Sequence, residues 1–436
     1  MSVIKENFKN IVYHKLKTGS VVLVLFAMVA GCETGTNTSD ELYDPLSFFL
    51  TWRTDPTTTM TIDWHTSPEC LNQSSVFHYK KAGTDEWIET TANYRSFPHT
   101  DLTIHRVEIR NLEPGTTYRV RFGGNSKEYK FNTMPAELEE PLRFATGGDT
   151  DHDDSFRKMN RAVMEFDPEF IVWGGDLAYA NADPVRAYRW PDFFQGIKET
   201  LVTDEGLITP IVVAIGNHEV FYSQRLIWGR NPHHEHTEEE ALAFMLKHNL
   251  WDGKPTFFHE LFAFPGDPAY GVLDFGDYMS LVILDSNHST PVAGGQAGWL
   301  REIMAERQGV PHMFPVYHVP AYPSHRSYDG TTSTQIREHW VPHFEEYGVR
   351  VAFENHDHTY KRTHPIRNGE IAEDGIVYLG DGSWARGPRD GDSKDEWYIH
   401  TFAEENHGII VTLDGDKQSY IMVNNEGVVF DTYENY

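Results

Sequence analysis

Side chains that could hold metal ions occur at five places where an apolar run gives way to a loop. In chain order they are Asp149, then Asp176 with Tyr179, then Asn217 beside His218, then His318, and finally His356 with His358. Carboxylate, amide and phenolate oxygens with imidazole nitrogens suit two ions about 3.5–4 Å apart. Asp176 could bridge both ions, whereas Tyr179 would serve one, preferably a hard trivalent ion. One such residue would more often be a capping group or a buried histidine, but the ordered set predicts a two-metal centre.

A series of predicted strands would bring these side chains together. Helical patterns such as residues 155–167, with Phe156, Met159, Val163 and Phe166 on one face, alternate with apolar runs. The runs that predict buried strands are residues 142–146, 170–173, 211–215, 279–285, 313–318 and 349–353. This alternation indicates α/β layers, in which strand ends on one edge of a sheet converge. The strand at residues 349–353, further strands at 375–380 and 408–413 and a hairpin at 418–430 are expected to complete a second sheet.

The chain before this region has a different pattern. Between Tyr43 and about Met134, short alternating runs predict a β-sandwich, with strands at residues 50–52, 60–64, 75–79, 105–109, 118–122 and 128–131. Residues 111–118 resemble the loop and strand that close fibronectin type III domains. The sequence of this part has no cluster of metal-ligand types. We therefore expect it to pack and space the domain that follows, with a carbohydrate- or partner-binding role as the alternative.

The first 31 residues resemble a secretory signal. Basic residues such as Lys5 and Lys9 precede an apolar run at residues 21–30, and the segment ends in Val-Ala-Gly before Cys32. About ten apolar residues are too few to span a bilayer. We expect an exported protein that is anchored to a bacterial membrane by a lipid on Cys32. The predicted organisation is a lipoprotein signal peptide at 1–31, a flexible tether at 32–42, the sandwich domain at 43–136 and the α/β domain at 137–436.

Composition narrows the possible partners. The formal net charge is −28, so a basic groove for nucleic acid is not expected, and the acidic balance is taken to serve solubility. Cys70 is the other of the two cysteines, so no internal disulfide is expected in the exported chain. The sequence leaves the oligomeric state open.

A long insertion separates His218 from Tyr270. Its residues 232–240 combine three histidines with acidic side chains, which more often form a solvated helix start than a further metal site. We expect this segment to lie near, and to overhang, the metal centre.

Five ordered blocks carry a resemblance to a known family. Residues 148–149 (Gly-Asp), 175–179 (Gly-Asp-Leu-Ala-Tyr), 216–219 (Gly-Asn-His-Glu), 316–318 (Val-Tyr-His) and 356–358 (His-Asp-His) resemble the purple acid phosphatases, within the calcineurin-like metallophosphoesterases. The likeness covers about residues 43–436. It implies a fibronectin type III-like sandwich followed by an α/β domain in which two sheets form a β-sandwich flanked by helices.

The resemblance also implies a set of ligands and two cofactors. One ion, typically Fe(III), would be held by Asp149, Asp176, Tyr179 and His358. A second, divalent ion, which could be Zn, Mn or Fe, would be held by Asp176, Asn217, His318 and His356.

Two residues depart from the family pattern. Asp151 stands where a glycine is usual, and in the wider superfamily a metal-binding histidine often occupies this place, so Asp151 could be an added ligand. Asn355 replaces the glycine before the last block, and an asparagine tolerates left-handed backbone angles nearly as a glycine does.

The expected activity is hydrolysis of phosphate monoesters of small molecules by a metal-bound hydroxide, as in acid phosphatases. His218 lies beside a ligand without being needed as one, so it is the first candidate for protonating the leaving oxygen. His325 and Arg326, which follow His318, are candidates for binding the phosphate. A phosphodiesterase or nucleotide hydrolase that uses the same site is one alternative, and a catalytically weak substrate-binding lipoprotein is another.

Overall fold

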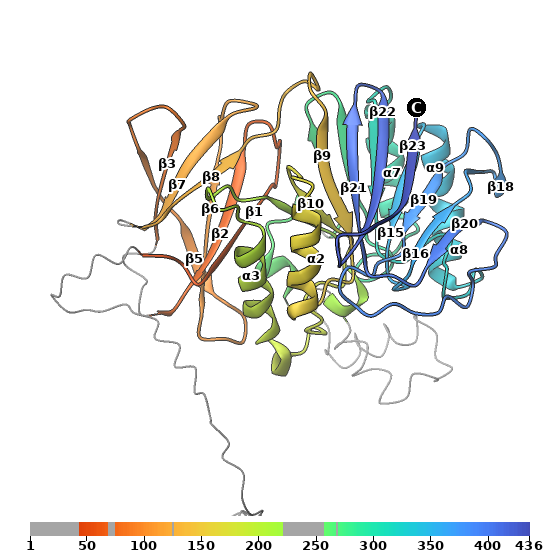
Figure 1. Cartoon of the computed structure of the whole chain (residues 1–436), viewed down its shortest axis with the longest axis horizontal. Helices are drawn as coiled ribbons and strands as arrows, with labels where there is room; N and C mark the ends of the chain where they lie inside the picture. Colours follow the sequence, from red (N-terminus) through yellow and green to blue (C-terminus); the bar gives the residue numbers. More distant parts are fainter. Residues whose placement is uncertain (1–42, 69–74, 124–125, 221–256, 267–268) are drawn as a thin grey trace, which may run out of the picture. The chain divides into compact units, whose positions relative to one another are not determined.

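The computed structural model describes residues 43–68, 75–123, 126–220, 257–266 and 269–436 (Figure 1). The predicted signal, the tether, Cys32, Cys70 and the histidine-containing segment at 232–240 lie outside these residues. All described residues belong to one compact unit, Ser39–Tyr436. Among them, no helix is both long enough and apolar enough to cross a membrane.

The described part of the first domain forms two antiparallel sheets of four strands each. One has the order β1 (Ser47–Thr51), β2 (Met60–Thr66), β6 (Thr103–Ile109) and β5 (Asn93–Ser96), and the other β4 (Ile88–Thr91), β3 (Val76–Lys81), β7 (Thr117–Phe122) and β8 (Glu128–Asn132). Aromatic rings fill the space between the sheets, where Phe48 stacks on Phe122 at 5.0 Å between centroids. Strands β4 and β5 were not predicted, because their side chains are mostly exposed and show no apolar alternation.

The second domain contains a mixed sheet that carries the first three ligand loops. Its order is β11 (Ile211–Val213), β10 (Ile171–Trp173), β9 (Leu142–Gly147), β21 (His407–Asp414), β22 (Lys417–Asn424) and β23 (Val429–Asn435). Strands β9, β10 and β11 are parallel, so their carboxyl ends share one edge.

A second sheet carries the remaining ligand loops. Its order is β12 (Gly271–Phe275), β13 (Met279–Ile283), β14 (His312–Val316), β15 (Val351–Glu354), β19 (Val377–Gly380), β16 (Tyr360–Thr363) and β20 (Ile399–Ala403), and the short pair β17 (Ile366–Arg367) and β18 (Glu370–Ile371) lies apart. Strands β13, β14, β15 and β19 are parallel. Phe144 on β9 contacts Phe314 on β14 with ring centroids 5.6 Å apart, so the two sheets pack face to face.

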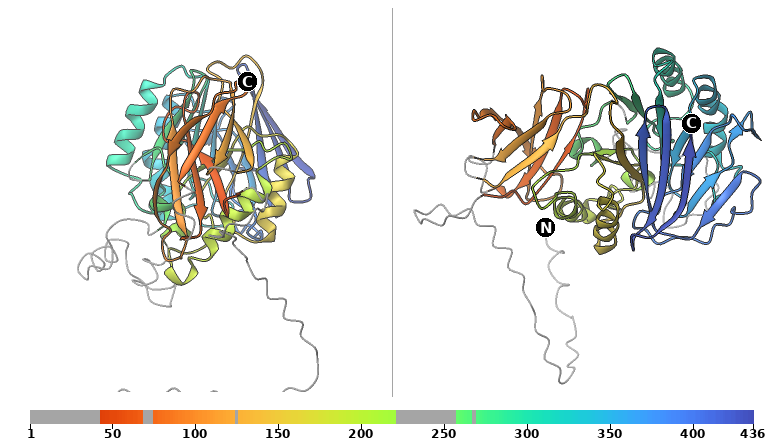
Figure 2. Two further views of the ribbon diagram at one scale, coloured as in Figure 1. Left: turned by 90° about the vertical axis from the view of Figure 1, so that its left-hand side faces the viewer. Right: turned by 45° about the horizontal axis from the view of Figure 1, so that its top comes forward.

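Helices cover the outer faces of both sheets. α2 (Asp154–Met164) and α3 (Arg189–Thr200) lie side by side, with Phe156 stacked on Phe193. α7 (Gly295–Glu306), α8 (Thr331–His339) and α9 (Val341–Glu346) bury apolar side chains in a separate core with residues of β13 and β15. The left view of Figure 2 shows the green-cyan helices and the yellow α2 on opposite sides of the sheets. The short elements η2 (Pro184–Arg186), η3 (Asn217–Glu219) and α6 (Phe258–Leu261) lie in the loops.

One expectation about the sheets was wrong. The strand at 407–414 and the C-terminal hairpin do not complete the second sheet but extend the first, because β21 pairs antiparallel with β9. Most residues of β21 are buried. A run that is apolar on both faces predicts a central strand, but it carries no information on which sheet receives it.

The sandwich and the second domain share one hydrophobic core among the described residues. Phe49 on β1 stacks on Phe194 of α3 at 5.0 Å between ring centroids, and Trp52 meets Phe170 edge to face. At the rim, Arg106 is paired with the buried Asp63 and also donates to the carbonyl of Leu261. The sandwich therefore packs directly against the elements that precede two of the ligand loops.

Candidate metal centre

The ligand loops share an unusual backbone conformation. Asp149, Asp176, Tyr179, His356 and His358 all have positive φ angles, between 50° and 82°. Such angles are uncommon for residues with a side chain and persist where the surrounding structure determines them. Each of these residues lies in a loop that follows a buried strand, so the chain turns sharply and directs its polar side chain toward the common sheet edge.

Three of the predicted ligands form a first cluster. The hydroxyl of Tyr179 donates to Oδ1 of Asp149 at 2.9 Å, and Nε2 of His358 lies 2.9 Å from the same oxygen. The distance from the Tyr179 hydroxyl to Nε2 of His358 is 3.1 Å. Oδ2 of Asp149 accepts from the backbone N–H of His356 at 2.9 Å, which ties the first ligand loop to the last.

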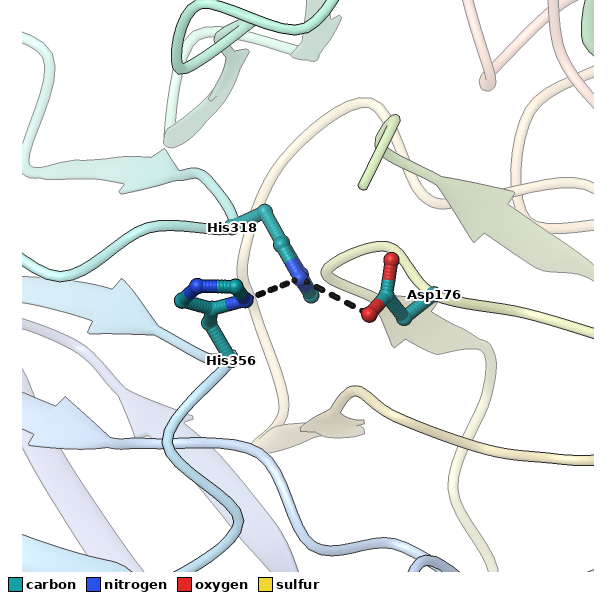
Figure 3. A group of neighbouring side chains, drawn as sticks. All are labelled: Asp176, His318 and His356. Atoms are coloured by element: carbon teal, nitrogen blue, oxygen red, sulfur yellow. Dashed lines mark hydrogen bonds and ion pairs between the residues drawn. The ribbon is translucent and has the colours of Figure 1, made fainter. Parts of the chain in front are cut away.

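Four predicted ligands form a second cluster, part of which is drawn in Figure 3. Nε2 of His318 lies 3.2 Å from Oδ2 of Asp176, 3.0 Å from Nδ1 of His356 and 3.3 Å from Oδ1 of Asn217. Three of these residues each place one ligand atom within 4.8 Å of the other two, namely Asp176, His318 and His356. The resemblance places Asp176 at both ions, and in the structure its carboxylate lies in the second cluster, beside His318.

The chemistry of the second cluster fits a cation. Nδ1 of His318 donates to the carbonyl of Gly174 at 2.9 Å, so Nε2 is the ring atom that faces the centre. Nε2 lies next to a carboxylate, an amide oxygen and another imidazole nitrogen. Burial opposes the charged form of His318, but the carboxylates of Asp176 and Asp149 outweigh it and raise its pKa to about 9. The groups around Nε2 favour a positive charge between them, which a proton on His318 supplies in the free protein and a bound metal ion would supply in its place.

His218 lies beside both clusters. Its backbone N–H donates to Oδ1 of Asp176 at 2.7 Å, and Nε2 of its ring lies 3.7 Å from Oδ2 of that residue. The ring packs on Tyr179 at 4.1 Å between centroids and its Nδ1 bonds Oδ1 of Asn181. Burial lowers its pKa, although Asp176 and Asp149 act in the opposite direction. The side chain keeps 23% of its surface exposed, so a substrate can reach it.

His325 and Arg326 lie on a loop that is fixed to the last ligand block. Oδ2 of the buried Asp357 accepts from the backbone N–H groups of Ser324, His325 and Arg326 at 3.0, 2.8 and 3.1 Å. Nη1 of Arg326 donates to Oδ1 of Asp357 at 2.6 Å and to the carbonyl of His356 at 2.8 Å. Arg326 thus sits beside a ligand, whereas the ring of His325 is 4.0 Å from the exposed carboxylate of Asp392.

The two departures from the family pattern have structural explanations. Asp151 accepts from Nη1 of Arg386 at 2.7 Å and from His152, so both of its oxygens are already engaged. Burial raises its pKa, but the hydrogen bonds from His152 and Arg386 outweigh that effect and lower it to about 2.

Asn355 does not adopt a left-handed backbone, and the positive angles fall on His356 and His358 instead. Its side chain is buried, donates to the carbonyl of Tyr317 and lies where a Cβ at Gly148 or Gly174 would be. The two glycines before the first ligand loops therefore leave room for this asparagine.

Sequence reasoning missed several residues around the site. Glu219 accepts from the backbone N–H groups of Gly216, Asp176 and Leu177 and joins two ligand loops, and His288 follows β13 with its ring 5.4 Å from that of His318. Arg386 and Arg389 follow β19 in a loop without periodicity. Glu219 could have been found, because it lies within the third block. The others carried no signal beyond their position after a strand.

Comparison with known proteins decides the family. Residues 142–360 match the family described as calcineurin-like phosphoesterase. The chain belongs to the calcineurin-like phosphoesterase family. Residues 45–133 match the family described as the N-terminal domain of purple acid phosphatase, which accounts for the sandwich. The match to the calcineurin-like phosphoesterases supports metal-dependent hydrolysis of phosphoesters. The two clusters of candidate ligands are consistent with such an activity.

The relatives include plant enzymes. Purple acid phosphatase 21 of Arabidopsis thaliana is 27% identical over 348 residues, which cover 78% of this chain and 72% of that protein. The purple acid phosphatase PPD1 of yellow lupin has a similar structure, with a TM-score of 0.70 at 16% identity over 89% of this chain and 73% of that one. The structure titled PhoD matches with a TM-score of 0.62 at 13% identity over 86% of each chain. The predicted fold, a β-sandwich followed by a metallophosphoesterase α/β domain, is confirmed.

Proposed function

We propose that this calcineurin-like phosphoesterase hydrolyses phosphate monoesters of small molecules at the two-cluster centre. The observation that carries the proposal is the convergence of seven ligand-type side chains, from both sheets, into two adjoining clusters at one edge. The relatives include plant purple acid phosphatases, which favours the monoester among phosphoesters.

Asp149, Tyr179 and His358 would hold one ion, and Asn217, His318 and His356 the other, with Asp176 shared. The phenol of Tyr179 favours Fe(III) for the first ion, and we propose Zn, Mn or Fe as the divalent partner. Bound cations would supply a water nucleophile of lowered pKa and offset the charge on the phosphoryl oxygens. Asp151 is left out of this ligand set because Arg386 and His152 occupy its oxygens.

The chain's own residues would orient the ester and move a proton. Arg326 offers guanidinium nitrogens beside His356 and suits two oxygens of one phosphoryl group. His218, on the Asp176 side, is in place to give a proton to the leaving oxygen. His325 adds a further donor at the loop that carries Arg326. With these groups fixed before the substrate arrives, little reorganisation is needed at the transition state.

Assays on two substrates test the proposal. The metal-loaded protein should hydrolyse an aryl phosphate with a higher kcat/KM than a bis-aryl phosphate. A preference for the diester would favour a phosphodiesterase or nucleotide hydrolase instead. Absence of turnover on both, at full metal occupancy, would favour a substrate-binding lipoprotein. Metal analysis and the visible spectrum of the isolated protein would identify the ions.

We also propose that the protein is exported and held at a bacterial membrane by a lipid on Cys32. The expected support is a Cys32→Ser variant that accumulates as an unlipidated precursor and leaves the detergent phase. Unchanged partitioning of this variant would contradict the lipid anchor.

A further inference from the structure

The loop at residues 321–326, which carries Arg326, lies outside helices and strands and is held by buried side chains. The N–H of Ala321 donates to Oε1 of Glu354 at 2.6 Å. The last three N–H groups of the loop all donate to Oδ2 of Asp357. The conformation of the loop, and with it the position of Arg326, therefore depends on the side chains that bind its backbone.

Lys361 on β16 links three neighbouring strands to this loop. β19 lies between β15 and β16 (Figure 1), and its Gly380 pairs with Glu354 on one side and with Lys361 on the other. Because Gly380 has no side chain, the Lys361 side chain can cross β19, and its Nζ donates to Oε2 of Glu354 at 2.5 Å. Nζ also donates to Oδ1 of Asp381, directly after β19, at 3.1 Å, and to the carbonyl of Tyr322. The three donors of the ammonium are thus all used within the protein.

The ammonium and its two carboxylate partners are withdrawn from solvent. The side chains of Lys361, Glu354 and Asp381 have no exposed surface. Burial opposes the charge of Lys361, but Asp381 and Glu354 outweigh it and raise its pKa. Removing one member of such a buried group leaves an uncompensated charge, so the three side chains hold one another in place. Since no donor of Lys361 remains for a substrate, its contribution is to fix its neighbours.

Asp381 extends these contacts to the loop that carries Arg326. Its Oδ2 accepts from the N–H of Ser324 at 3.1 Å and from the hydroxyl of the same residue. The N–H of Ser324 is shared with Asp357, whose other oxygen accepts from Nη1 of Arg326 at 2.6 Å. A continuous series of contacts therefore leads from the ammonium of Lys361 to the guanidinium of Arg326.

We propose that Lys361 is a positioning residue for phosphate binding, which fixes the 321–326 loop so that Arg326 is held ready for the phosphoryl group of the substrate. This inference rests on the proposed function. Lys361 makes no contact with the substrate and acts through Arg326. Without Lys361, the carbonyl of Tyr322 would lose its buried donor and Asp381 the cation beside it. The loop would then have to be ordered when phosphate binds, which weakens binding.

Lys361→Met, made in the wild type and in a Glu354→Gln background, tests the positioning role. The background keeps an oxygen that can accept from Ala321, and the double variant keeps the excess of one negative charge among the three buried groups. Lys417→Met, at a solvent-accessible ion pair, is the matched control and should leave the kinetics unchanged. At full metal content, kcat/KM of the double variant for an aryl phosphate should lie about tenfold below that of Glu354→Gln, mainly through KM.

A double-mutant cycle with Arg326→Ala separates positioning from a general structural role. If Lys361 acts through Arg326, adding Lys361→Met to Arg326→Ala should cause less than about a twofold further loss of kcat/KM. Additive losses, loss of metal, or a lower kcat with KM unchanged would overturn the proposal. Circular dichroism shows whether Lys361→Met is folded, and the Glu354→Gln background carries the test if it is not. Failure of both forms to fold would assign Lys361 to the stability of the sheet and reject the positioning role.

Phosphate binding makes the test independent of turnover. If the wild-type protein hydrolyses no phosphate ester, the proposed function fails, but calorimetry with inorganic phosphate still tests Lys361. The metal-loaded Glu354→Gln protein should then bind inorganic phosphate about tenfold more tightly than the double variant with Lys361→Met. Equal affinities, or no binding by either protein, would reject the positioning role.

Discussion

Two fully buried histidines, one in the sandwich and one at the metal centre, have pKa values that are shifted in opposite directions. His65 on β2 packs among Phe49, Phe97 and Phe194, and burial, with smaller effects from His105, Arg106 and Arg95, lowers its pKa to about 3. His318 is equally buried, yet the carboxylates of Asp176 and Asp149 raise its pKa to about 9. At equal burial, the neighbouring charges therefore decide the direction in which the pKa of a histidine is shifted. In the sandwich the imidazole serves as an aromatic core residue, and at the sheet edge it belongs to a site that needs a cation.

The backbone shows the same contrast. In the described part of the sandwich, non-glycine residues with positive φ are confined to the turn residues His99 and Asn111. At the metal edge the left-handed residues include the candidate ligands themselves. Strained residues and buried charges thus occur together where chemistry is proposed, while the sandwich contributes regular strands and aromatic packing.

Asp176→Asn should have the largest effect, because it removes the charge that faces both His318 and His218. We expect loss of metal and a fall in turnover. The fall should exceed the roughly 10- to 100-fold loss that is typical when a residue hydrogen-bonded to a metal ligand is replaced. The sandwich should stay folded. Asp374→Asn, on an exposed carboxylate that pairs with Arg367, is the matched control and should keep both metal and turnover. Metal analysis and kcat of both variants make the comparison; an active Asp176→Asn protein with full metal content would refute the shared-ligand assignment.

The sequence could predict that the candidate ligands lie close together, because each of them follows a buried strand. It could also predict the sandwich, because apolar and polar residues alternate along several of its strands. It could not predict which sheet takes the C-terminal hairpin, since strand pairing depends on contacts far apart in the chain. Nor could it predict that Arg389 and His288 lie near the centre, because an irregular loop has no periodic pattern that indicates the direction of a side chain. Asn355 illustrates the same limit, since its role depends on two glycines more than 180 positions away.

His218→Ala should have the next largest effect. If His218 gives a proton to the leaving oxygen, kcat should fall by a factor of about 10²–10⁴ while both metals remain. The loss should shrink for an aryl ester, whose leaving group needs little protonation, and be greatest for an alkyl ester. His400→Ala, on the exposed part of β20, is the control. Equal losses on the two esters would count against proton donation, and a rise in KM with kcat unchanged would assign His218 to binding.

Asp357→Asn should have a smaller effect, because Asp357 positions Arg326 and touches no substrate. We expect kcat/KM for an aryl phosphate to fall by roughly 10- to 100-fold, with most of the change in KM. The decisive measurement is a double-mutant cycle with Arg326→Ala. If Asp357 acts through Arg326, the double variant should be no worse than Arg326→Ala. Additive losses would show that Asp357 has a separate structural role.

The smallest effect on activity is expected from His65, where the comparison can be tested through stability. Because its pKa is about 3 in the folded protein and about 6.5 when unfolded, only the unfolded chain binds a proton as the pH falls between these values. Stability that is fully present above pH 6.5 should therefore be lost toward pH 3, with a slope of at most about 1.4 kcal/mol per pH unit from this residue. His65→Gln should remove that component and leave kcat at neutral pH unchanged, whereas His339→Gln, on the partly exposed end of α8, should preserve the wild-type slope. Thermal unfolding of the three proteins between pH 7 and pH 4.5 measures the difference. Parallel profiles for wild type and His65→Gln would show that the pKa of His65 is not lowered in the folded protein. The contrast between the pKa values of His65 and His318 would then not hold.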